Sequence, residues 1–385
     1  MATERLFVVA TPGRSVCDDY ARALNAEGLL RIIALGTRRG VSGIPRERTR
    51  LQPAIGLLSY AGATVLSPYF AESFRANLFP WFDRWVRKQL RPGDHIISSY
   101  GYVNECFKWV RAHGGKTFLD AGNSHPDNFW QIISEEHRRW NCPYPPISPQ
   151  WHRRSMSMLE DVDFVLTPSS YVRESFVSRG FPESKILHTV YPVDFDCFIP
   201  ATEPRPASRP LTLISTGMLS LRKGTPYLLE AYRIVRREIS DARLILVRQI
   251  HDSIKPVLEK YSDLPIEWFP SMSHPQLADC LRRADIFILP SLEEGLARTA
   301  LEALACGIPA IVTAHTGAND FIRSGENGEA VPVRDADAIA NAVLKWTNKI
   351  TASGWRPRRL LTVEQFSFAL FERKFIRQLR ERGLV

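Results

Sequence analysis

The sequence lacks the features that mark several classes of protein. Its six cysteines are scattered along 385 residues without a single C-x-x-C pair, which argues against a zinc knuckle or a redox motif. No apolar stretch approaches the ~18 to 20 residues needed to span a bilayer, and the apolar run near the start, LFVVA, is too short for a secretory signal. We therefore expect a cytoplasmic protein whose thiols are reduced and mostly buried.

Low-complexity segments are also absent, and a content of 44% apolar and 24% charged residues is typical of a globular protein. The net charge is +9, and residues 351–385 alone supply +5 through 8 basic and 3 acidic side chains. A phosphate-bearing ligand or a solvated helix face would account for such a segment. Because we recognise neither a nucleic-acid reader motif nor interleaved aromatic platforms on which bases would stack, we expect no nucleic-acid partner.

The order of strand-like and helix-like segments predicts the fold. Short β-branched runs alternate with helical patterns from RLFVVA to KTFLD, and the alternation restarts at LTLISTG after a cluster of prolines between Pro200 and Pro210. This pattern is typical of parallel sheets covered by helices. We predict an α/β protein with two doubly wound, Rossmann-like domains, residues 1–200 and 207–362. A final amphipathic helix over about 363–385 can pack back on the first domain.

The segment EEGLARTALEALACGIP holds two acids, Glu294 and Glu302, in an E-x7-E spacing. Glu294 follows a predicted strand, and a helix is expected from about Ala297 to Ala305, ended by Gly307. At ~1.5 Å per residue the carboxylates lie up to ~12 Å apart, too far to share a metal but suited to the two ends of one ligand. Carboxylates accept hydroxyl donors and a helix N-terminus favours an anion, so the spacing predicts a nucleotide sugar. The alternative is a helix N-terminal acid and a solvated glutamate.

A second segment, GMLSLRKG, ends the first strand of the second predicted domain and opens its first helix. Lys223 offers a positive charge for phosphate, and the flanking Gly217 and Gly224 let the backbone approach a ligand. By itself this pattern is equally compatible with ordinary turn chemistry.

Together these segments resemble glycosyltransferase family 4, which has the two-domain GT-B fold and retains the configuration of the anomeric carbon. The resemblance runs in order through Tyr191-Pro-Val-Asp194, the G-x-L-x-x-R-K-G turn, the E-x7-E pair and the following A-C-G-I-P. The segment DAGNSHPDNFWQIISEEHRRW is similar to a polysaccharide-building subgroup. The resemblance implies that the first domain holds the acceptor and the second holds the donor, with a cleft between them.

The resemblance also implies roles for individual residues. Glu294 would bind the hydroxyls of the donor sugar, Glu302 the ribose and Lys223 the diphosphate. Gly13 would lie in the loop that approaches the donor phosphates and the acceptor, and His125 would contact the transferring sugar at the reaction centre. The other donor contacts that it implies come from Gly217, Arg222, Gly295, Leu296 and Ala297.

Two of these assignments carry an open alternative. The family often has arginine directly after the glycine that corresponds to Gly217, and this chain has Met218 there. Arg222 is the residue expected to replace its charge. For His125, the alternative to a role in the reaction is a polar turn histidine satisfied by the carboxylate of Asp120.

The predicted function is that of a metal-independent, retaining glycosyltransferase with no cofactor. It would move a sugar from a UDP- or GDP-linked donor to a glycan, lipid-linked or small-molecule acceptor, in the biosynthesis of cell-surface polysaccharide or glycoconjugates. Two alternatives are a nucleotide-sugar epimerase of the same fold, which uses no acceptor, and a non-catalytic protein that binds sugar nucleotides. Met218 is the main argument for the last.

Other patterns receive structural interpretations. D-x-D triplets hold a metal in a different glycosyltransferase fold, and here we predict helix ends, loops or caps for Asp161/Asp163, Asp194/Asp196 and Asp335/Asp337. No metal site is expected, because positive side chains and a helix N-terminus can neutralise the leaving diphosphate. The sequence Glu135-Glu-His137 is predicted to lie on a solvated helix face.

The segment PWFDRWVRKQL predicts a helix that starts at Pro80, with Trp81, Phe82, Trp85 and Val86 on one face and basic residues on another. Such a helix can lie on an anionic membrane surface at the inner face of the membrane. We favour the interpretation that its apolar face covers the sheet, because the pattern runs directly into the strand HIISSY.

Overall fold

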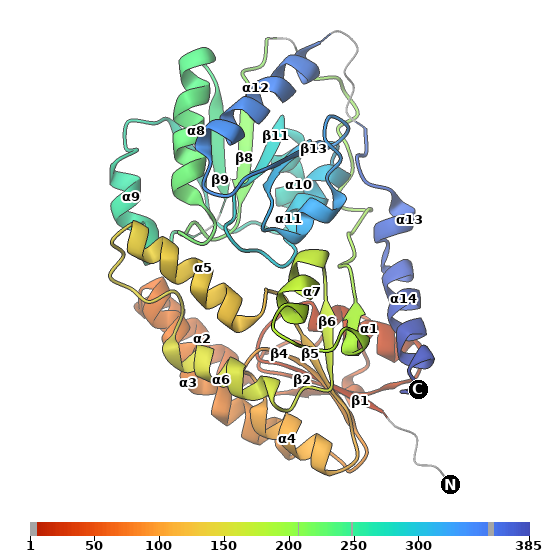
Figure 1. Cartoon of the computed structure of the whole chain (residues 1–385). Coiled ribbons are helices and arrows are strands. Elements are labelled where there is room, and N and C mark those ends of the chain that lie inside the picture. The colour runs from red at the N-terminus through yellow and green to blue at the C-terminus, as the bar shows by residue number, and fades with distance from the viewer. Residues whose placement is uncertain (1–5, 207, 248, 353–357) are drawn as a thin grey trace. The chain divides into compact units, whose positions relative to one another are not determined.

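The computed structural model describes residues 6–206, 208–247, 249–352 and 358–385, and the chain divides into two compact units. The first unit contains Met1–Gln131, Tyr144–Tyr191 and Phe368–Val385, and the second contains Ile132–Pro143 and Pro192–Ser367. Figure 1 shows one sheet in each unit, with helices on both of its faces. The predicted α/β fold with two doubly wound, parallel-sheet domains is confirmed.

The first unit is built on a seven-stranded parallel sheet in the order β3-β2-β1-β4-β5-β6-β7. Its strands are β1 (Phe7–Thr11), β2 (Leu30–Leu35), β3 (Thr49–Leu51), β4 (His95–Ser99), β5 (Thr117–Asp120), β6 (Phe164–Thr167) and β7 (Ile186–His188). Its helices are α1 (Cys17–Ala26), α2 (Pro53–Val65), α3 (Pro68–Arg87), α4 (Asn104–Ala112), α6 (Pro149–Leu159), α7 (Ser170–Val177), α14 (Phe368–Glu381) and the first part of α5 (Pro126–Arg139).

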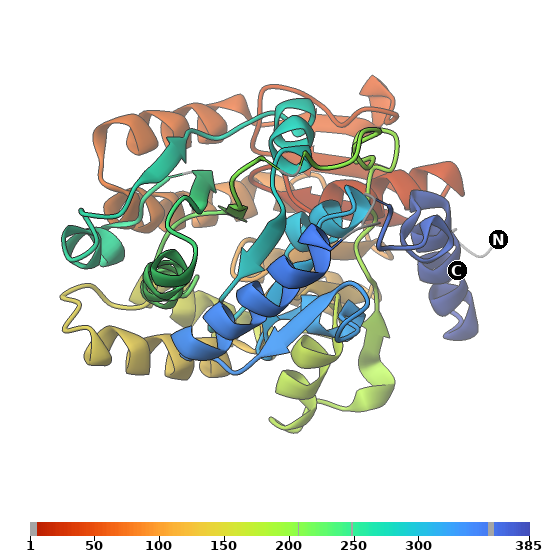
Figure 2. The ribbon, with the colours of Figure 1, turned by 90° about the horizontal axis from the view of Figure 1, so that it is seen from above.

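Successive residues of the central strand β1 face opposite sides of this sheet. Phe7 and Val9 pack with α1 and α14, whereas Val8 and Ala10 pack with side chains of α3, α4 and α7. This alternation follows from the period of two in an extended strand. Figure 2 shows α14 beside α1 although the two are far apart in the sequence, and Tyr20 of α1 contacts the ring of Phe375.

The second unit has a six-stranded parallel sheet in the order β10-β9-β8-β11-β12-β13. Its strands are β8 (Thr212–Thr216), β9 (Arg243–Val247), β10 (Ile266–Phe269), β11 (Ile286–Leu289), β12 (Ala310–Thr313) and β13 (Gly328–Val331). Its helices are α8 (Thr225–Glu238), α9 (Lys255–Glu259), α10 (His274–Arg282), α11 (Arg298–Ala305), α12 (Ala336–Thr351) and α13 (Val363–Phe366). Helices α8 and α12 pack on one face of the sheet through a continuous cluster that includes Tyr232 and Trp346.

The predicted helix start at Pro80 is wrong. Helix α3 begins at Pro68, and Pro80 lies inside it. Both prolines carry the same local signal, because proline is common in the first turn of a helix, and only the longer helix distinguishes them. Phe82 and Val86 are buried in the core of the first unit, as expected for a helix that covers the sheet, whereas Trp81 is exposed.

The final amphipathic segment forms two helices, α13 and α14, which belong to different units. In the described part of the chain, every helix is too short or too polar to pass through a bilayer.

Candidate active site

The strand order of each sheet identifies the loops where a ligand is expected. In the second unit, β9 and β10 lie on one side of β8, and β11, β12 and β13 lie on the other, so the sheet is extended in opposite directions from the point between β8 and β11. The corresponding point in the first unit lies between β1 and β4. In open α/β sheets, ligands bind at such a switch point, outside the carboxyl ends of the strands. The loop after β8 contains Lys223, the loop after β11 contains Glu294, and the loop after β1 contains Gly13. The topology therefore brings three of the predicted site residues to switch points.

The loop between β8 and α8 is a tight turn held by its own side chains. Ser220 N–H donates to Oγ1 of Thr225 at 3.1 Å, and Lys223 N–H donates to Oγ of Ser220 at 3.3 Å. Gly217 and Gly224 both have positive φ, at 116° and 65°. A Cβ at Gly224 would lie 1.9 Å from the carbonyl oxygen of Pro290, so only glycine allows the turn to pack against the end of β11.

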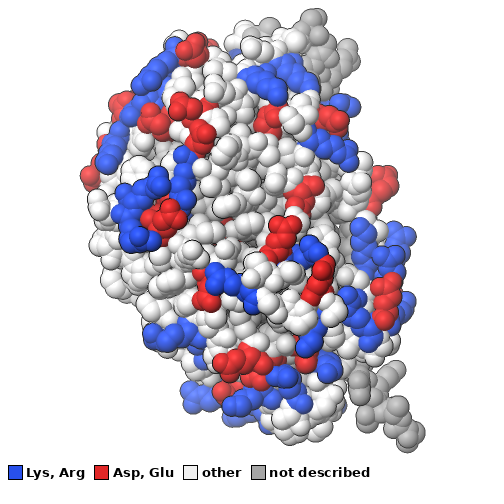
Figure 3. Space-filling model, in the orientation of Figure 1, with Lys and Arg blue, Asp and Glu red and all other residues white. Residues whose placement is uncertain are grey.

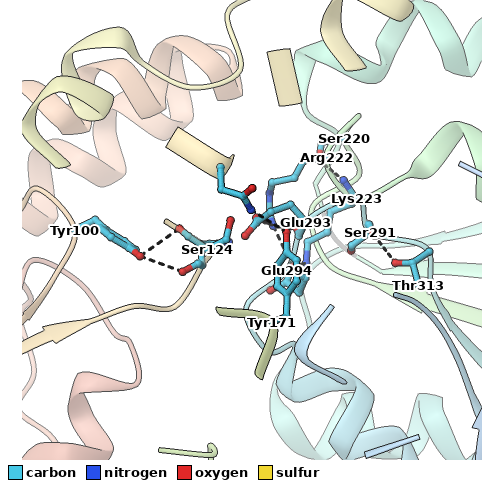
Figure 4. Close-up of polar contacts among 12 residues, drawn as sticks. Tyr100, Ser124, Tyr171, Ser220, Arg222, Lys223, Ser291, Glu293, Glu294 and Thr313 are labelled. Carbon is cyan, nitrogen blue, oxygen red and sulfur yellow. Dashed lines mark hydrogen bonds and ion pairs between the residues drawn. The ribbon is translucent and has the colours of Figure 1, made fainter. Parts of the chain in front are cut away.

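The turn brings Arg222 and Lys223 to the same carboxylate (Figure 4). Nη1 of Arg222 donates to Oε2 of Glu294 at 3.1 Å and to the carbonyl oxygen of Glu293 at 2.9 Å. Nζ of Lys223 donates to the same Oε2 of Glu294. Neighbouring side chains diverge in extended backbone, so their convergence depends on the turn at residues 221–224. The two cations predicted for the diphosphate therefore lie together.

The backbone fixes the position of Glu294 from the neighbouring loop. Its N–H donates to the carbonyl oxygen of His315 at 3.1 Å, and its carbonyl oxygen accepts from Gly317 N–H at 2.9 Å. Burial would raise the pKa of the Glu294 carboxyl, but Lys223 and Arg222 together hold the pKa below its ordinary value of 4.5. The pKa of Lys223 is lowered, because the effect of burial exceeds the raising effect of the negative charge of Glu294. Glu294 is therefore an anion at neutral pH, held by two cations.

Glu302 lies on α11, which runs from Arg298 to Ala305 as the sequence predicts within one residue. The residue is 6% exposed, so the alternative of a solvated glutamate is wrong. Burial raises the pKa of the Cys197 thiol, and the charges of Asp194 and then Glu302 raise it further. Burial also raises the pKa of the Cys306 thiol, with a smaller contribution from Glu302. The residues ahead of α11, Gly295, Leu296 and Ala297, are also buried.

In the first unit, Gly13 lies in the loop after β1, and its carbonyl oxygen accepts from Oγ1 of Thr11 at 2.8 Å. A Cβ at Gly13 would have no atom within 4 Å, and its φ is not positive. The local fold therefore does not require glycine here, unlike at Gly224, and open space adjoins the loop.

His125 precedes the first residue of α5 and is 8% exposed. Its N–H donates to Oγ of Ser175 at 2.9 Å, its Nδ1 accepts from Asp127 N–H at 3.2 Å, and its ring packs edge-on against Phe176. The Nδ1 contact leaves the proton of the neutral ring on Nε2. Burial lowers the pKa of His125 below its ordinary value of 6.5. The carboxylate of Asp120, the alternative partner, accepts from Ser99 at 2.8 Å.

Sequence reasoning missed two residues that shape these loops. The hydroxyl of Tyr100 donates to the carbonyl oxygens of Asn123 and Ser124, at 3.1 and 3.2 Å, and so holds the loop that carries His125 (Figure 4). Glu293 is fully buried, and its carboxylate lies 3.6 Å from Nη1 of Arg222. No local pattern distinguishes Tyr100, the last residue of HIISSY, whereas the doubled acid Glu293-Glu294 could have drawn attention to Glu293.

The prediction of a solvated face for Glu135-Glu-His137 is wrong for two of the three residues. Glu136 is fully buried, and its carboxylate accepts from Trp140, from the hydroxyl of Tyr227 and from Nε of Arg334. His137 is also buried. The second part of α5 packs within the second unit, so one side of the helix lies against protein.

One acid of each D-x-D triplet has a structural partner. Asp163 accepts from Thr117 N–H at 3.1 Å, Asp194 accepts from Asp196 N–H at 3.2 Å, and Asp335 caps α12 by accepting from Ala338 N–H at 2.8 Å. These bonds are the loop and cap contacts that the sequence predicts. Among the described residues, no group of three or more histidine, cysteine or acidic side chains could hold a metal ion.

Comparisons with known proteins address the second unit most directly. Residues 202–352 match the family described as "Glycosyl transferases group 1". Over 207 residues the chain is 28% identical to WcaL of Escherichia coli K12, provisionally named a colanic acid biosynthesis glycosyltransferase, covering 51% of this chain and 49% of that protein. Over 202 residues it is 29% identical to a GDP-mannose-dependent phosphatidylinositol monomannoside mannosyltransferase of Mycolicibacterium smegmatis, covering 48% and 52%. The chain thus spans about half the length of these curated relatives.

Solved structures match nearly the whole chain. Sucrose-phosphate synthase from Thermosynechococcus elongatus superposes with a TM-score of 0.71 at 19% identity, covering 98% of this chain and 99% of that one. At that identity the match establishes the fold alone. Residues 202–352 therefore form a glycosyl transferases group 1 domain, within a chain that has the GT-B fold.

Proposed function

We propose that the protein is a metal-independent glycosyltransferase that moves a sugar from a nucleoside diphosphate sugar to a glycan or lipid-linked acceptor, with retention at the anomeric carbon. The observation that carries the proposal is the meeting of Arg222 and Lys223 on the Glu294 carboxylate at the switch point of the second unit. A site with two cations and one buried acid has the charges that a diphosphate and a sugar hydroxyl require.

The two cations are suited to the diphosphate. As the bond between sugar and diphosphate breaks, negative charge grows on the leaving oxygen, and fixed positive groups near it lower the barrier. Arg222 and Lys223 are held in place by the β8–α8 turn before a ligand arrives, so little reorganisation is needed. In the proposed complex the diphosphate takes over part of their contact with Glu294, which then accepts from hydroxyls of the sugar.

The ribose end is assigned to Glu302. This carboxylate is buried on α11, two turns beyond the loop that holds Glu294. The names of the relatives support the ligand class, because one is named GDP-mannose-dependent and another is named for colanic acid biosynthesis. The acceptor is assigned to the first unit, where the Nε2–H of neutral His125 is the group available to orient it.

A thermal-shift screen of the full chain with UDP, GDP and their sugars tests the donor class. A ligand at 100 times its dissociation constant adds about 2.7 kcal/mol to the free energy of unfolding. Glu302→Ala should abolish the shift from the free nucleotide as well as from the donor, because the ribose is common to both. The matched control is Glu326→Ala, which removes an exposed glutamate of the same unit.

Product analysis then separates the three candidate functions. Transfer to an acceptor, with the new linkage in the donor's anomeric configuration by NMR, supports the proposal. A new sugar nucleotide formed without acceptor identifies an epimerase. A rise in melting temperature with nucleotide, without turnover of any donor, identifies a non-catalytic binder.

A further inference from the structure

Helix α2 of the first unit is apolar and yet exposed. None of its 13 residues is charged, and only Ile55 and Gly62 are buried. Tyr60 and Val65 are 72% and 82% exposed. A helix without a charged face is normally buried in a protein core or in a membrane. The first unit does not bury α2, so the apolar outer surface of this helix is left exposed.

The exposed apolar surface extends beyond this helix. No charged residue occurs between Leu51 and Ala71, a stretch of 21 residues in which a charged content of 24% would place about five. Of the large apolar side chains that are exposed among the described residues, most lie on this stretch or on α3. These residues form the hairpin patch: Leu51, Leu57, Leu58, Tyr60, Val65, Leu66, Phe70 and Trp81. Exposed apolar side chains gathered on two neighbouring helices are typical of a binding site.

The inner side of α2 is closely packed, so the patch does not result from a loosely docked helix. A Cβ at Gly62 would lie 2.7 Å from Cδ1 of Phe74 on α3, and a Cβ at Gly56 would lie 2.6 Å from the carbonyl oxygen of Gly36. These two glycines let α2 approach α3 and the loop after β2. Helix α2 lies beside α3 in Figures 1 and 2.

Basic residues lie next to the hairpin patch. The segment 36–50, which ends where the uncharged stretch begins, contains five arginines and one acidic residue. Four of the arginines are exposed: Arg38, Arg39, Arg46 and Arg50. Arg38 and Arg39 follow Gly36 and Thr37, whose backbones adjoin Gly56 of α2. An apolar surface bordered by arginines is complementary to the acyl chains and the negative head groups of an anionic bilayer.

We propose that the hairpin patch and the arginines of segment 36–50 bind the surface of an anionic lipid bilayer. Helix α2 would lie in the interface, because 13 residues at ~1.5 Å each span about 20 Å, less than the ~30 Å hydrocarbon core. A second copy of the chain would cover the apolar side chains, but contact between two copies would bring like-charged arginines together. The charge therefore favours lipid over self-association.

The position of α2 suggests what such binding achieves. Helix α2 starts after β3, at the same edge of the parallel sheet as the loops that carry Gly13 and His125. Binding at this edge would bring the proposed acceptor loops to the membrane, where a lipid-linked acceptor resides. This last step rests on the proposed glycosyl transfer, whereas bilayer binding itself does not.

Vesicle flotation of the full chain tests the proposal, with phosphatidylcholine vesicles alone and with added phosphatidylglycerol. The parent should float with the anionic vesicles and bind neutral ones at least about tenfold more weakly. The double variant Tyr60→Glu/Val65→Glu and the double variant Arg38→Ser/Arg39→Ser should each weaken binding to anionic vesicles about tenfold or more. Val177→Glu is the matched control, because Val177 is also an exposed valine at the last residue of a helix in the first unit. It should bind like the parent.

Circular dichroism should give parental melting for all variants, since the changed side chains are on the surface. A parent that fails to float, or a Tyr60→Glu/Val65→Glu protein that floats like the parent, overturns the proposal. The proposal is also contradicted if the parent binds no vesicles and is a dimer in analytical ultracentrifugation that the Tyr60→Glu/Val65→Glu change converts to a monomer. A protein that binds vesicles but transfers no sugar refutes the proposed function and leaves this inference standing.

Discussion

At the scale of single residues, Glu294 is held in place by two cations and two backbone bonds. If it bonds sugar hydroxyls more strongly as charge develops at the anomeric carbon, Glu294→Gln should lower kcat about a hundredfold. Nucleotide affinity should change little, because glutamine can still accept from Arg222 and Lys223. Steady-state kinetics and calorimetry with free nucleotide measure the two effects. Equal kcat in variant and parent would remove Glu294 from the reaction.

Arg222 is predicted to replace the charge that Met218 does not provide. Its guanidinium shares the Glu294 carboxylate with Lys223, so both cations can reach one diphosphate. Arg222→Ala should lower kcat/KM by about one to three powers of ten. Met218→Arg should recover part of this loss in the Arg222→Ala background. An Arg222→Ala enzyme that transfers sugar like its parent contradicts the replacement.

His125 predicts a pH dependence of stability. Burial lowers its pKa in the folded state below 6.5, the ordinary value that applies to the unfolded chain. Between these two values the unfolded chain binds more protons, so the free energy of unfolding rises with pH and the contribution is complete above 6.5. Denaturant titrations at several pH values should show that the free energy of unfolding rises less steeply with pH for His125→Gln than for the parent. Identical slopes would mean that His125 does not titrate in this way.

At the scale of elements, the β8–α8 turn depends on one glycine. Gly224→Ala should combine the cost of a left-handed conformation, about 1 to 2 kcal/mol, with a clash against Pro290 at 1.9 Å. The matched control is Gly180→Ala, because Gly180 also has positive φ but a Cβ there would have no atom within 4 Å. Chemical denaturation should therefore find Gly224→Ala the more destabilising by about 1 kcal/mol or more. Equal losses would show that the turn can move away from β11.

At the scale of the whole molecule, the charges of the site bear on the need for a metal. Arg222 and Lys223 supply positive charge at the proposed diphosphate position, and acids of the D-x-D triplets are engaged in loop and cap bonds. Sugar transfer should therefore survive EDTA at full rate. Loss of activity with EDTA that Mn²⁺ or Mg²⁺ restores would overturn the proposed mechanism.

The excess of basic residues is also a property of the whole chain. Figure 3 shows Lys and Arg interspersed with Asp and Glu over the face drawn, so on this face the net charge of +9 does not gather in one patch. The basic segments that matter to the proposals are local: the pair Arg222 and Lys223 for the donor, and segment 36–50 for the bilayer. Their effect depends on neighbouring groups within about one Debye length rather than on the net charge.

Much of the fold follows from local patterns in the sequence. The alternation of strand and helix predicts parallel sheets, because the spacing of apolar residues along the sequence indicates which side of a strand or helix is buried. Helix α11 was predictable because a strand precedes it and Gly307, with a φ of 83°, follows it. Helix α2 is missing from the prediction because it is apolar on all sides, so periodicity assigns it no buried face.

The sequence by itself determined the two doubly wound domains, because these depend on the local order of strands and helices. The family resemblance, rather than local order, assigned Glu294 and Lys223 to one ligand. Only the tertiary structure decided which side chains meet across long separations. Glu136 and Arg334 are 198 residues apart and form a buried contact that no local pattern signals. Arg222 reaches Glu294 only because Gly224 turns the chain against Pro290. Burial depends on all the elements packed around a residue, so a short stretch of sequence cannot specify it.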